Sequence, residues 1–194
     1  MQLTAPKTLA AAVFLLALLL PYPISRWWML RREHRFDPLI LDAGRRYQVH
    51  PALIKAVIWQ ESRFQAEALG TKEEIGLMQV REDAAFEWAE AEHLTNFTHA
   101  EILDPGKNIH AGTFYLGKVL KRYRATDNPL PYALADYNAG RANVLRWSKG
   151  AAATNAVAFI NQIEFPMTRR YAIAVMDRYA LYREEFKPPV TGSK

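Results

Sequence analysis

The sequence of 194 residues contains no cysteine. This absence excludes a disulfide scaffold, a thiol nucleophile and a cysteine-ligated metal, and we expect no lipid anchor attached through an N-terminal cysteine. The five histidines share no metal-ligand spacing with carboxylates, and no glycine-rich loop for binding a nucleotide is present. We therefore expect neither a metal site nor a cofactor.

Low-complexity tracts and strand patterns are also missing. Half of the residues are hydrophobic, so the chain is too rich in core-forming side chains to be disordered. No segment shows the convincing alternation of a half-buried strand, and no motif recurs at a fixed period. The sequence therefore predicts a mainly α protein with one domain, at most two.

Acidic residues are slightly fewer than basic ones: the sequence has 20 acidic and 25 basic residues, and the net charge is +5. This mild excess favours an acidic partner or surface without identifying it. No nucleic-acid motif accompanies the basic cluster that precedes and enters the helical part of the chain. We interpret this cluster as contacts with anionic lipid and expect no nucleic-acid partner. Its members are Arg31, Arg32, Arg35, Arg45 and Arg46.

Residues 8–25 carry no side chain that is charged at neutral pH, and residues 9–20 are almost entirely aliphatic. Such a segment is typical of a cleaved signal peptide, a retained membrane anchor or, less often, a buried core helix. No small-x-small cleavage site follows it, and the bulky residues beyond it, including Trp27 and Trp28, suit a membrane interface. We favour a retained anchor helix of about the minimum length that spans a bilayer.

From about Asp37 the pattern is helical. Asp37 and Pro38 are typical of an N-cap and a first helical residue, and a second helix is predicted to start at Pro51. The last helix is predicted over residues 168–186, with two prolines ending it. The predicted organisation is an anchor and basic juxtamembrane segment (residues 1–36), a helical domain (37–187) and a C-terminal tail (188–194).

Glu61 ends an apolar stripe on the helix that starts at Pro51. Leu53, Ile54 and Val57 follow the spacing of one buried helical face, and Glu61 is a later position on it. Aliphatic surroundings and the negative end of the helix dipole would both raise the pKa of this carboxyl group. A glutamic acid that stays protonated near neutral pH can act as a general acid. The structural alternative is that Glu61 turns to solvent or pairs with a neighbouring cation, Arg63 or Lys72.

The sequence around Glu61 resembles the soluble-lytic-transglycosylase type of peptidoglycan-cleaving enzyme over about residues 38–180. Three motifs occur in the family's order and spacing: Glu61-Ser62-Arg63-Phe64, Gly76-Leu77-Met78-Gln79-Val80 and Ala135-Asp136-Tyr137-Asn138-Ala139-Gly140. Two weaker stretches resemble the family's middle helix and last motif. They are Asp104-Pro105, Asn108-Ile109 and Tyr115-Leu116, and Phe165-Pro166 with Thr168-Arg169-Arg170-Tyr171.

The resemblance implies a mainly α, lysozyme-like fold of the goose-type lysozyme and transglycosylase kind, with a groove for glycan strands. It implies cleavage of the β-1,4 bond between N-acetylmuramic acid and N-acetylglucosamine, with the muramyl 6-hydroxyl closing onto C1 to leave a 1,6-anhydro end. Glu61 would protonate the glycosidic oxygen and then, as a carboxylate, accept the proton of the 6-hydroxyl. An intramolecular hydroxyl at high effective concentration removes the need for a second carboxylate that activates water.

Two other functions stay open at this point. A hydrolytic muramidase of the same fold would use water and leave reducing ends, and an inactive glycan-binding module would bind the strand without cleaving it. The intact Glu61 argues against the inactive module.

The resemblance also assigns substrate-binding roles. Ser62 and Gln79 would hydrogen-bond near the acid or the sugar, and Met78 would line the groove. Amide and hydroxyl groups suit acetamido and sugar hydroxyl groups, while aromatic rings cover the apolar faces of sugars. Taken alone, residues 76–78 are equally typical of a turn followed by core packing. Tyr137 and Asn138 would form the opposite wall, although Tyr137 alone would more often be a core tyrosine, and Tyr171 would complete the site.

The chain departs from the family pattern between the first two motifs. Many members have a serine where this chain has Gly70, a glycine where it has Glu73, and Met-Pro where it has Arg81 and Glu82. We expect the loop before Gly76 to run differently, a hydrogen bond that tunes the acid to be absent, and Arg81 to offer a cationic contact to an acidic stem peptide. Glu73, Glu74 and Asp83 are the nearest carboxylates that could stabilise a cationic transition state, but solvated surface is the favoured interpretation of each.

Location follows from the implied substrate. Positive residues prefer the cytoplasmic side of a membrane, and the arginines after the apolar segment would by themselves place the domain inside. Peptidoglycan lies outside the cytoplasmic membrane, so we instead expect the N-terminus inside and the domain in the periplasm or cell-wall space. The expected partners are glycan strands, the membrane and an unidentified component of the envelope machinery.

Overall fold

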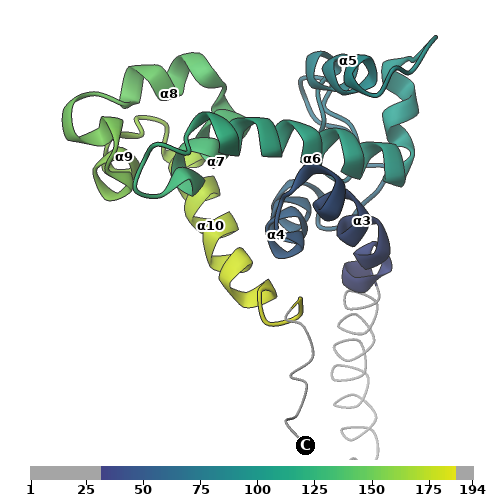
Figure 1. The fold of residues 1–194 in the computed structure, drawn as a ribbon, viewed down its shortest axis with the longest axis horizontal. Helices are drawn as coiled ribbons and strands as arrows, with labels where there is room; N and C mark the ends of the chain where they lie inside the picture. The colour runs from purple at the N-terminus through teal and green to yellow at the C-terminus, as the bar shows by residue number, and fades with distance from the viewer. Residues whose placement is uncertain (1–31, 187–194) are drawn as a thin grey trace, which may run out of the picture. The chain divides into compact units, whose positions relative to one another are not determined.

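The structure is a computed structural model that describes residues 32–186 (Figure 1). The chain separates into two compact units, Met1–Phe36 and Asp37–Lys194, and all elements named below belong to the second. The predicted anchor over residues 8–25 and the predicted tail over residues 188–194 lie outside the described residues. Among the described residues, no helix is both long and apolar enough to cross a membrane.

The second unit is helical, so the mainly α prediction is confirmed. No β-strand is found in the part of it that the structure describes, although isolated bridges join Leu69 to Ile75 and Ile75 to Val80. The α-helices are α3 (Asp37–Tyr47), α4 (Pro51–Ser62), α5 (Glu82–Ala91), α6 (Pro105–Arg122), α7 (Pro129–Ala139), α8 (Arg141–Trp147), α9 (Ala156–Gln162) and α10 (Pro166–Tyr182), and the 3-10 helices are η1 (His99–Leu103) and η2 (Gly150–Ala153).

Prolines start four of these helices, α4, α6, α7 and α10. Proline has a suitable φ for a first helical position, and its missing N–H costs nothing there because that group would have no intrahelical partner. Side chains cap three of the same helices. His50 accepts a bond from the N–H of Ala52 in α4, Asp104 one from Lys107 in α6, and Asn128 one from Leu130 in α7. The predicted starts at Asp37 and Pro51 are confirmed.

The last helix, α10, differs from its prediction. It begins and ends earlier than predicted, so the two prolines beyond it do not end it. Pro166 fixes the start, because a proline is favoured at the first helical position. Its predicted core stripe is found at Tyr171, Val175 and Tyr182, which are buried, whereas Tyr179 is half-exposed.

Helix α4 is the centre of the core. The sequence predicts a single buried stripe on it, but every residue from Ala52 to Ile58 is buried, because α3 and α10 both pack against it. The buried set includes Lys55, whose ammonium group lies 2.9 Å from a carboxylate oxygen of Asp37 and 2.7 Å from one of Glu185. These two ion pairs compensate a charge that would otherwise be costly to remove from water.

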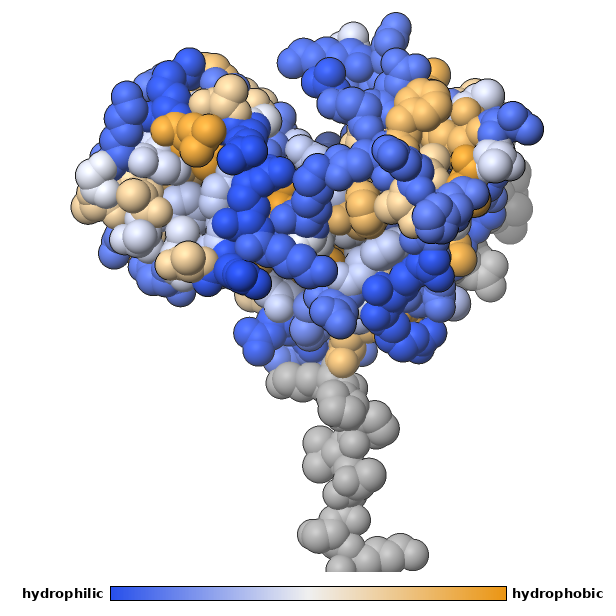
Figure 2. Space-filling model, turned by 45° about the horizontal axis from the view of Figure 1, so that its top comes forward, coloured by the Kyte–Doolittle hydropathy of each residue, from blue (hydrophilic) through white to orange (hydrophobic). Residues whose placement is uncertain are grey.

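Packing contacts of α10 and α6 bring distant segments together at one face. Helix α10 packs against both α4 and α7, and α6 packs against α7, α3 and α5. Figure 1 shows α6 running across this unit, with α3, α4 and α5 toward one end and α7, α8 and α9 toward the other. The surface is hollowed between the side that carries α5 and the side that carries α8 and α9 (Figure 2). The C-terminal ends of α4 and α7 therefore meet across this hollow.

Candidate active site

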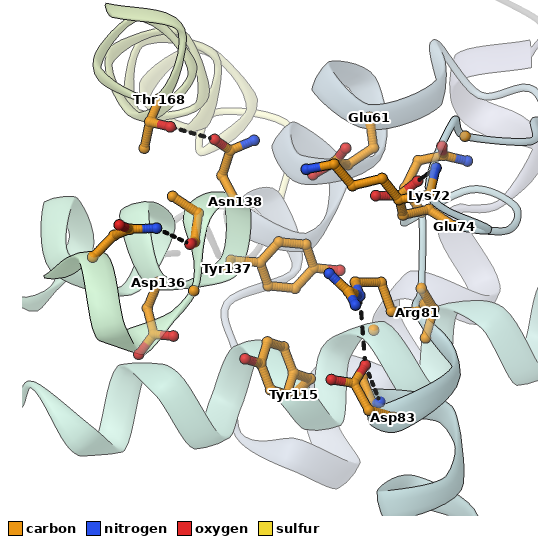
Figure 3. Close-up of a pocket in the computed structure, with 18 of the residues that line it drawn as sticks. Glu61, Lys72, Glu74, Arg81, Asp83, Tyr115, Asp136, Tyr137, Asn138 and Thr168 are labelled. Carbon is orange, nitrogen blue, oxygen red and sulfur yellow. Dashed lines mark hydrogen bonds and ion pairs between the residues drawn. The ribbon is translucent and has the colours of Figure 1, made fainter. Parts of the chain in front are cut away.

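A pocket of about 600 Å³ opens at this hollow. The end of α4, the loop of residues 70–81 and the start of α5 form one wall, and the end of α7 with the start of α10 forms the other. Tyr115 of α6 lies beneath them (Figure 3). Polar and charged side chains are prominent in the lining, among them Glu61, Lys72, Glu74, Arg81, Asp83 and Asn138.

Glu61 lies in the last turn of α4 and lines this pocket. The helix stops one residue later because Arg63 and Phe64 adopt left-handed backbone conformations, with φ of 52° and 61°. Figure 3 shows the side chain of Glu61 above the ring of Tyr137, between the loop and α7. The carboxyl group is half-buried, since it opens on the pocket and is enclosed by protein on its other sides.

Burial raises the pKa of Glu61 to about 7, and two neighbours modify this effect. The hydroxyl of Tyr171 donates a 2.6 Å hydrogen bond to Oε1 of Glu61, which lowers the pKa because it stabilises the carboxylate. The negative charge of Glu74 raises the pKa. The raised pKa predicted from the sequence is confirmed, with burial as its largest cause.

Within the described residues, Glu61 does not form the ion pair with a neighbouring cation that was the alternative interpretation of its position. In residues 32–186, Glu61 makes no ion pair with Arg63 or Lys72. The guanidinium of Arg63 lies instead 3.1 Å from the centre of the Trp59 ring. Lys72 extends into the pocket from the loop. The proton of Glu61 is therefore not displaced by a bound cation.

Ser62 does not lie in the pocket lining, so its predicted bond to the acid or to a sugar is wrong for this structure. Its side chain is buried, and its hydroxyl lies 2.8 Å from the carbonyl oxygen of Leu77 and 3.2 Å from that of Ile58. A hydroxyl has one proton to donate, and here carbonyl groups take it. Ser62 therefore ties the end of α4 to the following loop.

Met78 does not line the groove with its side chain, which is a second correction. The side chain is fully buried, and its sulfur lies 3.8 Å from the hydroxyl of Thr113 and against Gly112 of α6. A side chain at position 112 would meet this sulfur at 2.6 Å, so the glycine makes room for it. The backbone of Met78 does contribute, because its carbonyl oxygen accepts a 2.9 Å bond from the hydroxyl of Tyr137.

Gln79 lines the pocket, and its amide nitrogen bonds to the loop rather than to Glu61. That nitrogen donates to the carbonyl oxygens of Ala68 and Gly76 at 3.1 and 3.0 Å. The amide oxygen faces Gly70, since a Cβ there would lie 2.7 Å from it. The residue therefore shapes the wall in which it stands.

Asn108 holds the loop that lines the pocket, a role that the sequence motifs did not assign. Its amide oxygen accepts a 2.8 Å bond from the N–H of Met78, and its amide nitrogen donates to the carbonyls of Ile75 and Ile102 at 2.7 and 3.0 Å. A Cβ at Gly76 would lie 2.2 Å from this nitrogen, so that glycine is needed for the approach as well as for its φ of 79°. The available signal was an amide among the apolar residues of its helix.

The opposite wall is formed by the end of α7, as predicted. Tyr137 lies with its ring in the pocket and its hydroxyl on Met78, so it bridges the two walls. Asn138 is exposed at the pocket, and its amide oxygen accepts a 2.8 Å bond from the hydroxyl of Thr168 on α10. Thr168 was part of a recognised motif without an assigned role, and the bond joins α10 to the wall.

Tyr171 contacts Glu61 from the protein interior and does not line the pocket. It is buried in α10, and its contribution is the hydroxyl on Glu61. Burial raises the pKa of this hydroxyl well above its ordinary value, so it stays protonated and available as a donor. No group of three or more histidine and acidic side chains suited to a metal is found where the structure describes the chain.

A family model described as the transglycosylase SLT domain matches residues 38–160. A relative named membrane-bound lytic murein transglycosylase C, from Pectobacterium atrosepticum, is 33% identical over 60% of this chain and 34% of its own length. The soluble lytic murein transglycosylase of Escherichia coli K12 is 31% identical over 82% of this chain and 27% of its own. The chain thus spans about a third or less of the length of these two relatives.

Solved structures show the same likeness. The 70-kDa soluble lytic transglycosylase in complex with bulgecin A has a TM-score of 0.72 and 26% identity, covering 84% of this chain and 26% of that one. An inactive mutant of the lytic transglycosylase Slt from Pseudomonas aeruginosa has a TM-score of 0.69 and 25% identity, covering 76% and 24%. The likeness extends over most of this chain and about a quarter of each of those.

Proposed function

Because the chain belongs to the transglycosylase SLT family, we propose that it is a lytic transglycosylase that cleaves peptidoglycan. The bond cleaved is the β-1,4 bond between N-acetylmuramic acid and N-acetylglucosamine, and the product carries a 1,6-anhydromuramyl end. One observation supports this function above the others. Glu61 opens on the pocket as a carboxyl group whose pKa of about 7 makes both its acid and its base form accessible near neutral pH.

The reaction uses one carboxyl group twice. Protonated Glu61 gives its proton to the glycosidic oxygen as the bond to C1 breaks, and positive charge develops on the muramyl ring. The carboxylate then takes the proton of the 6-hydroxyl, whose oxygen forms the new bond to C1. Glu61 is protonated again at the end, and no water is consumed.

Tyr171 supports both steps. Its hydroxyl bonds to Oε1 of Glu61, and no hydrogen bond of the described residues engages Oε2. The carboxyl group is thus held in orientation while one oxygen stays available to the substrate. The bond also stabilises the carboxylate that exists between the two proton transfers.

Both walls offer groups that suit a glycan strand. Gln79 and Asn138 carry amide groups that would pair with acetamido and hydroxyl groups, and the ring of Tyr137 would cover an apolar sugar face. Arg81 on the rim would meet a carboxylate of the stem peptide. Ser62 and Met78, with their side chains buried, would act by fixing the loop.

The test is digestion of purified sacculi by the full-length protein beside Glu61→Gln. We expect soluble muropeptides with 1,6-anhydro ends from the wild type and a rate lower by roughly a thousandfold in the variant, the range of general acid–base contributions. Mass spectrometry of the products separates the alternatives. Reducing ends alone would show a hydrolytic muramidase, and binding without release would show an inactive glycan-binding module.

For the location, residues 8–25 would hold the catalytic domain at the outer face of the cytoplasmic membrane, in the periplasm or cell-wall space. One of the two relatives described above is named membrane-bound and the other soluble, so the family contains both kinds. A topology reporter fused after the last residue, Lys194, should give a signal outside the cytoplasm. A purely cytoplasmic signal would contradict this location.

A further inference from the structure

The carboxylate of Glu74 occupies the space beside Gly70. A Cβ at position 70 would lie 2.3 Å from Oε2 of Glu74 and 2.7 Å from the amide oxygen of Gln79. No side chain fits there while Glu74 keeps its place. The glycine found where the family pattern has a serine is therefore matched by a carboxylate that comes from elsewhere in the same loop.

The loop holds Glu74 by both its backbone and its side chain. The N–H of Gly70 donates to the carbonyl oxygen of Glu74 at 2.7 Å, and the N–H of Lys72 donates to its Oε2 at 2.9 Å. The turn between them requires a positive φ of 65° at Glu73. The side chain of Glu74 is thus fixed on the inner side of the turn, whereas Glu73 is exposed and does not line the pocket.

Glu74 lines the same pocket as Glu61, on the loop that faces the end of α4 (Figure 3). Its negative charge raises the pKa of Glu61. A nearby negative charge makes ionisation of Glu61 less favourable, so Glu61 keeps its proton to a higher pH.

We propose that Glu74 is a second carboxylate of the site, seated in the space that Gly70 leaves, and that its charge acts on the reaction through Glu61 by holding the catalytic proton there. The proposal rests on the proposed function, because it concerns the acid of that reaction. Glu74 is a positioning residue in this scheme, and it activates no water. The same negative charge favours the cationic muramyl ring after the proton has left.

Other charged and titratable groups also face Glu61. Tyr171 from α10 donates to it and lowers its pKa, and Tyr137 from α7 lies below it with a neutral hydroxyl. The remaining charged residues of the lining are Lys72, Arg81 and Asp83, from the loop and the start of α5, and Asp136 from α7, whose carboxylate is bonded to Arg122 and Tyr123. None of them is a cause of the pKa shift of Glu61.

The experiment compares Glu74→Gln with the matched control Glu73→Gln in the full-length protein. Each variant removes one negative charge from the same turn, and glutamine at position 74 can still accept the bond from Lys72. The pH dependence of muropeptide release and the titration of the Glu61 carboxyl carbon by 13C NMR are measured for both. The Glu61 resonance is assigned by its loss in Glu61→Gln.

We expect the alkaline limb of activity and the NMR midpoint to move to lower pH in Glu74→Gln and to stay in place in Glu73→Gln. Glu74→Asp, which keeps the charge, should return both toward the wild type. A Glu61 midpoint that is the same in wild type and Glu74→Gln overturns the proposal. A purely structural role for Glu74 would change the rate at all pH values and leave the midpoint unmoved.

Gly70→Ala provides an independent approach to the same carboxylate. The added Cβ would push it from its place without offering a hydroxyl to Glu61, so the midpoint should move in the same direction, and adding Glu74→Gln should move it no further. Additive shifts would contradict the pairing of Gly70 with Glu74. The NMR titration needs no turnover, so a wild type that releases no anhydro ends would refute the proposed function, while an unmoved midpoint would refute this inference alone.

Discussion

The two walls of the pocket are built in different ways. One wall contains the segment of residues 64–81, which has no helix. Side chains hold the backbone of this segment, because Asn108, Ser62 and Gln79 all bond to its peptide groups. The wall made by α7 and α10 satisfies its backbone within its own helices and adds side chains to the site. The irregular wall therefore depends on a few single side chains, whereas the helical wall depends on packing distributed over many.

The walls also act differently on the residue between them. Both bury Glu61, which is the largest cause of its raised pKa. Beyond burial, Tyr171 of the helical wall lowers the pKa by hydrogen bonding, and Glu74 of the loop raises it by its charge. The value near 7 is thus a balance, and each wall can be altered separately.

The largest expected effect is loss of the amide that holds the loop. Asn108→Ala would leave the N–H of Met78 and the carbonyl of Ile102 without this partner, whereas the carbonyl of Ile75 keeps the bond from the N–H of Val80. Since an unsatisfied buried group costs about 1–3 kcal/mol, we expect the free energy of unfolding to fall by about 4 kcal/mol. Chemical denaturation measures this change, and glycan release should fall with it.

A matched variant in the helical wall sharpens this prediction. Thr168→Val removes the single bond to Asn138, whose amide is exposed and can bond to water instead. We expect a loss of about 1 kcal/mol. Equal losses in the two variants would show that the walls do not differ in the way described.

The next effect tests the burial that both walls share. The pKa of Glu61 rises from 4.5 to about 7 on folding, so the native state binds the extra proton between these values and stability falls as pH rises through that window. Above pH 8 the buried charge costs about 3 kcal/mol. Glu61→Gln should therefore be more stable than the wild type by up to about 3 kcal/mol at pH 9.

At pH 4 the two proteins should have nearly equal stability, because Glu61 is then protonated in the folded and unfolded states alike. Thermal or denaturant unfolding at both pH values provides the comparison. A constant difference across pH would mean that the carboxyl group titrates normally.

The smallest expected effect tests whether the two walls shift the pKa of Glu61 in opposite directions. Tyr171→Phe removes the bond that favours the carboxylate, so the alkaline limb of activity should move to higher pH, opposite to Glu74→Gln. The loss of one charge-assisted bond should also lower the rate roughly tenfold. The pH dependence of muropeptide release measures both changes. If the alkaline limb moved in the same direction in both variants, the two walls would not shift the pKa of Glu61 in opposite directions.

Much of the helical framework could be predicted from the sequence. The starts at Asp37 and Pro51 follow from capping and proline preferences, which act within a few residues. The family was identified from motifs and is confirmed by the match over residues 38–160. The raised pKa of Glu61 also followed, because a carboxylate at the end of an apolar stripe meets poor solvation in most packings.

The roles within the loop could not be predicted in this way. Ser62 and Met78 belong to the motifs, yet their side chains point into the core. The hydroxyl of Ser62 bonds to the carbonyl of Leu77, and the side chain of Met78 packs against Gly112. Without regular secondary structure, side-chain direction follows from which distant partner is available, and Asn108 is one such partner. Local sequence preferences do not contain that information.

The sequence by itself determined the mainly α class, the helix starts at Asp37 and Pro51, the charge balance and the presence of one carboxyl group at the end of an apolar face. The tertiary structure alone decided which groups surround that carboxyl group. Tyr171 comes from a helix far along the chain, and its bond to Glu61 depends on how α4 and α10 pack. Glu74 comes from a turn that Gly70 permits, and its charge acts on Glu61 across the pocket. The physical reason is that caps and helical periodicity are local, whereas burial and charge interactions act through space.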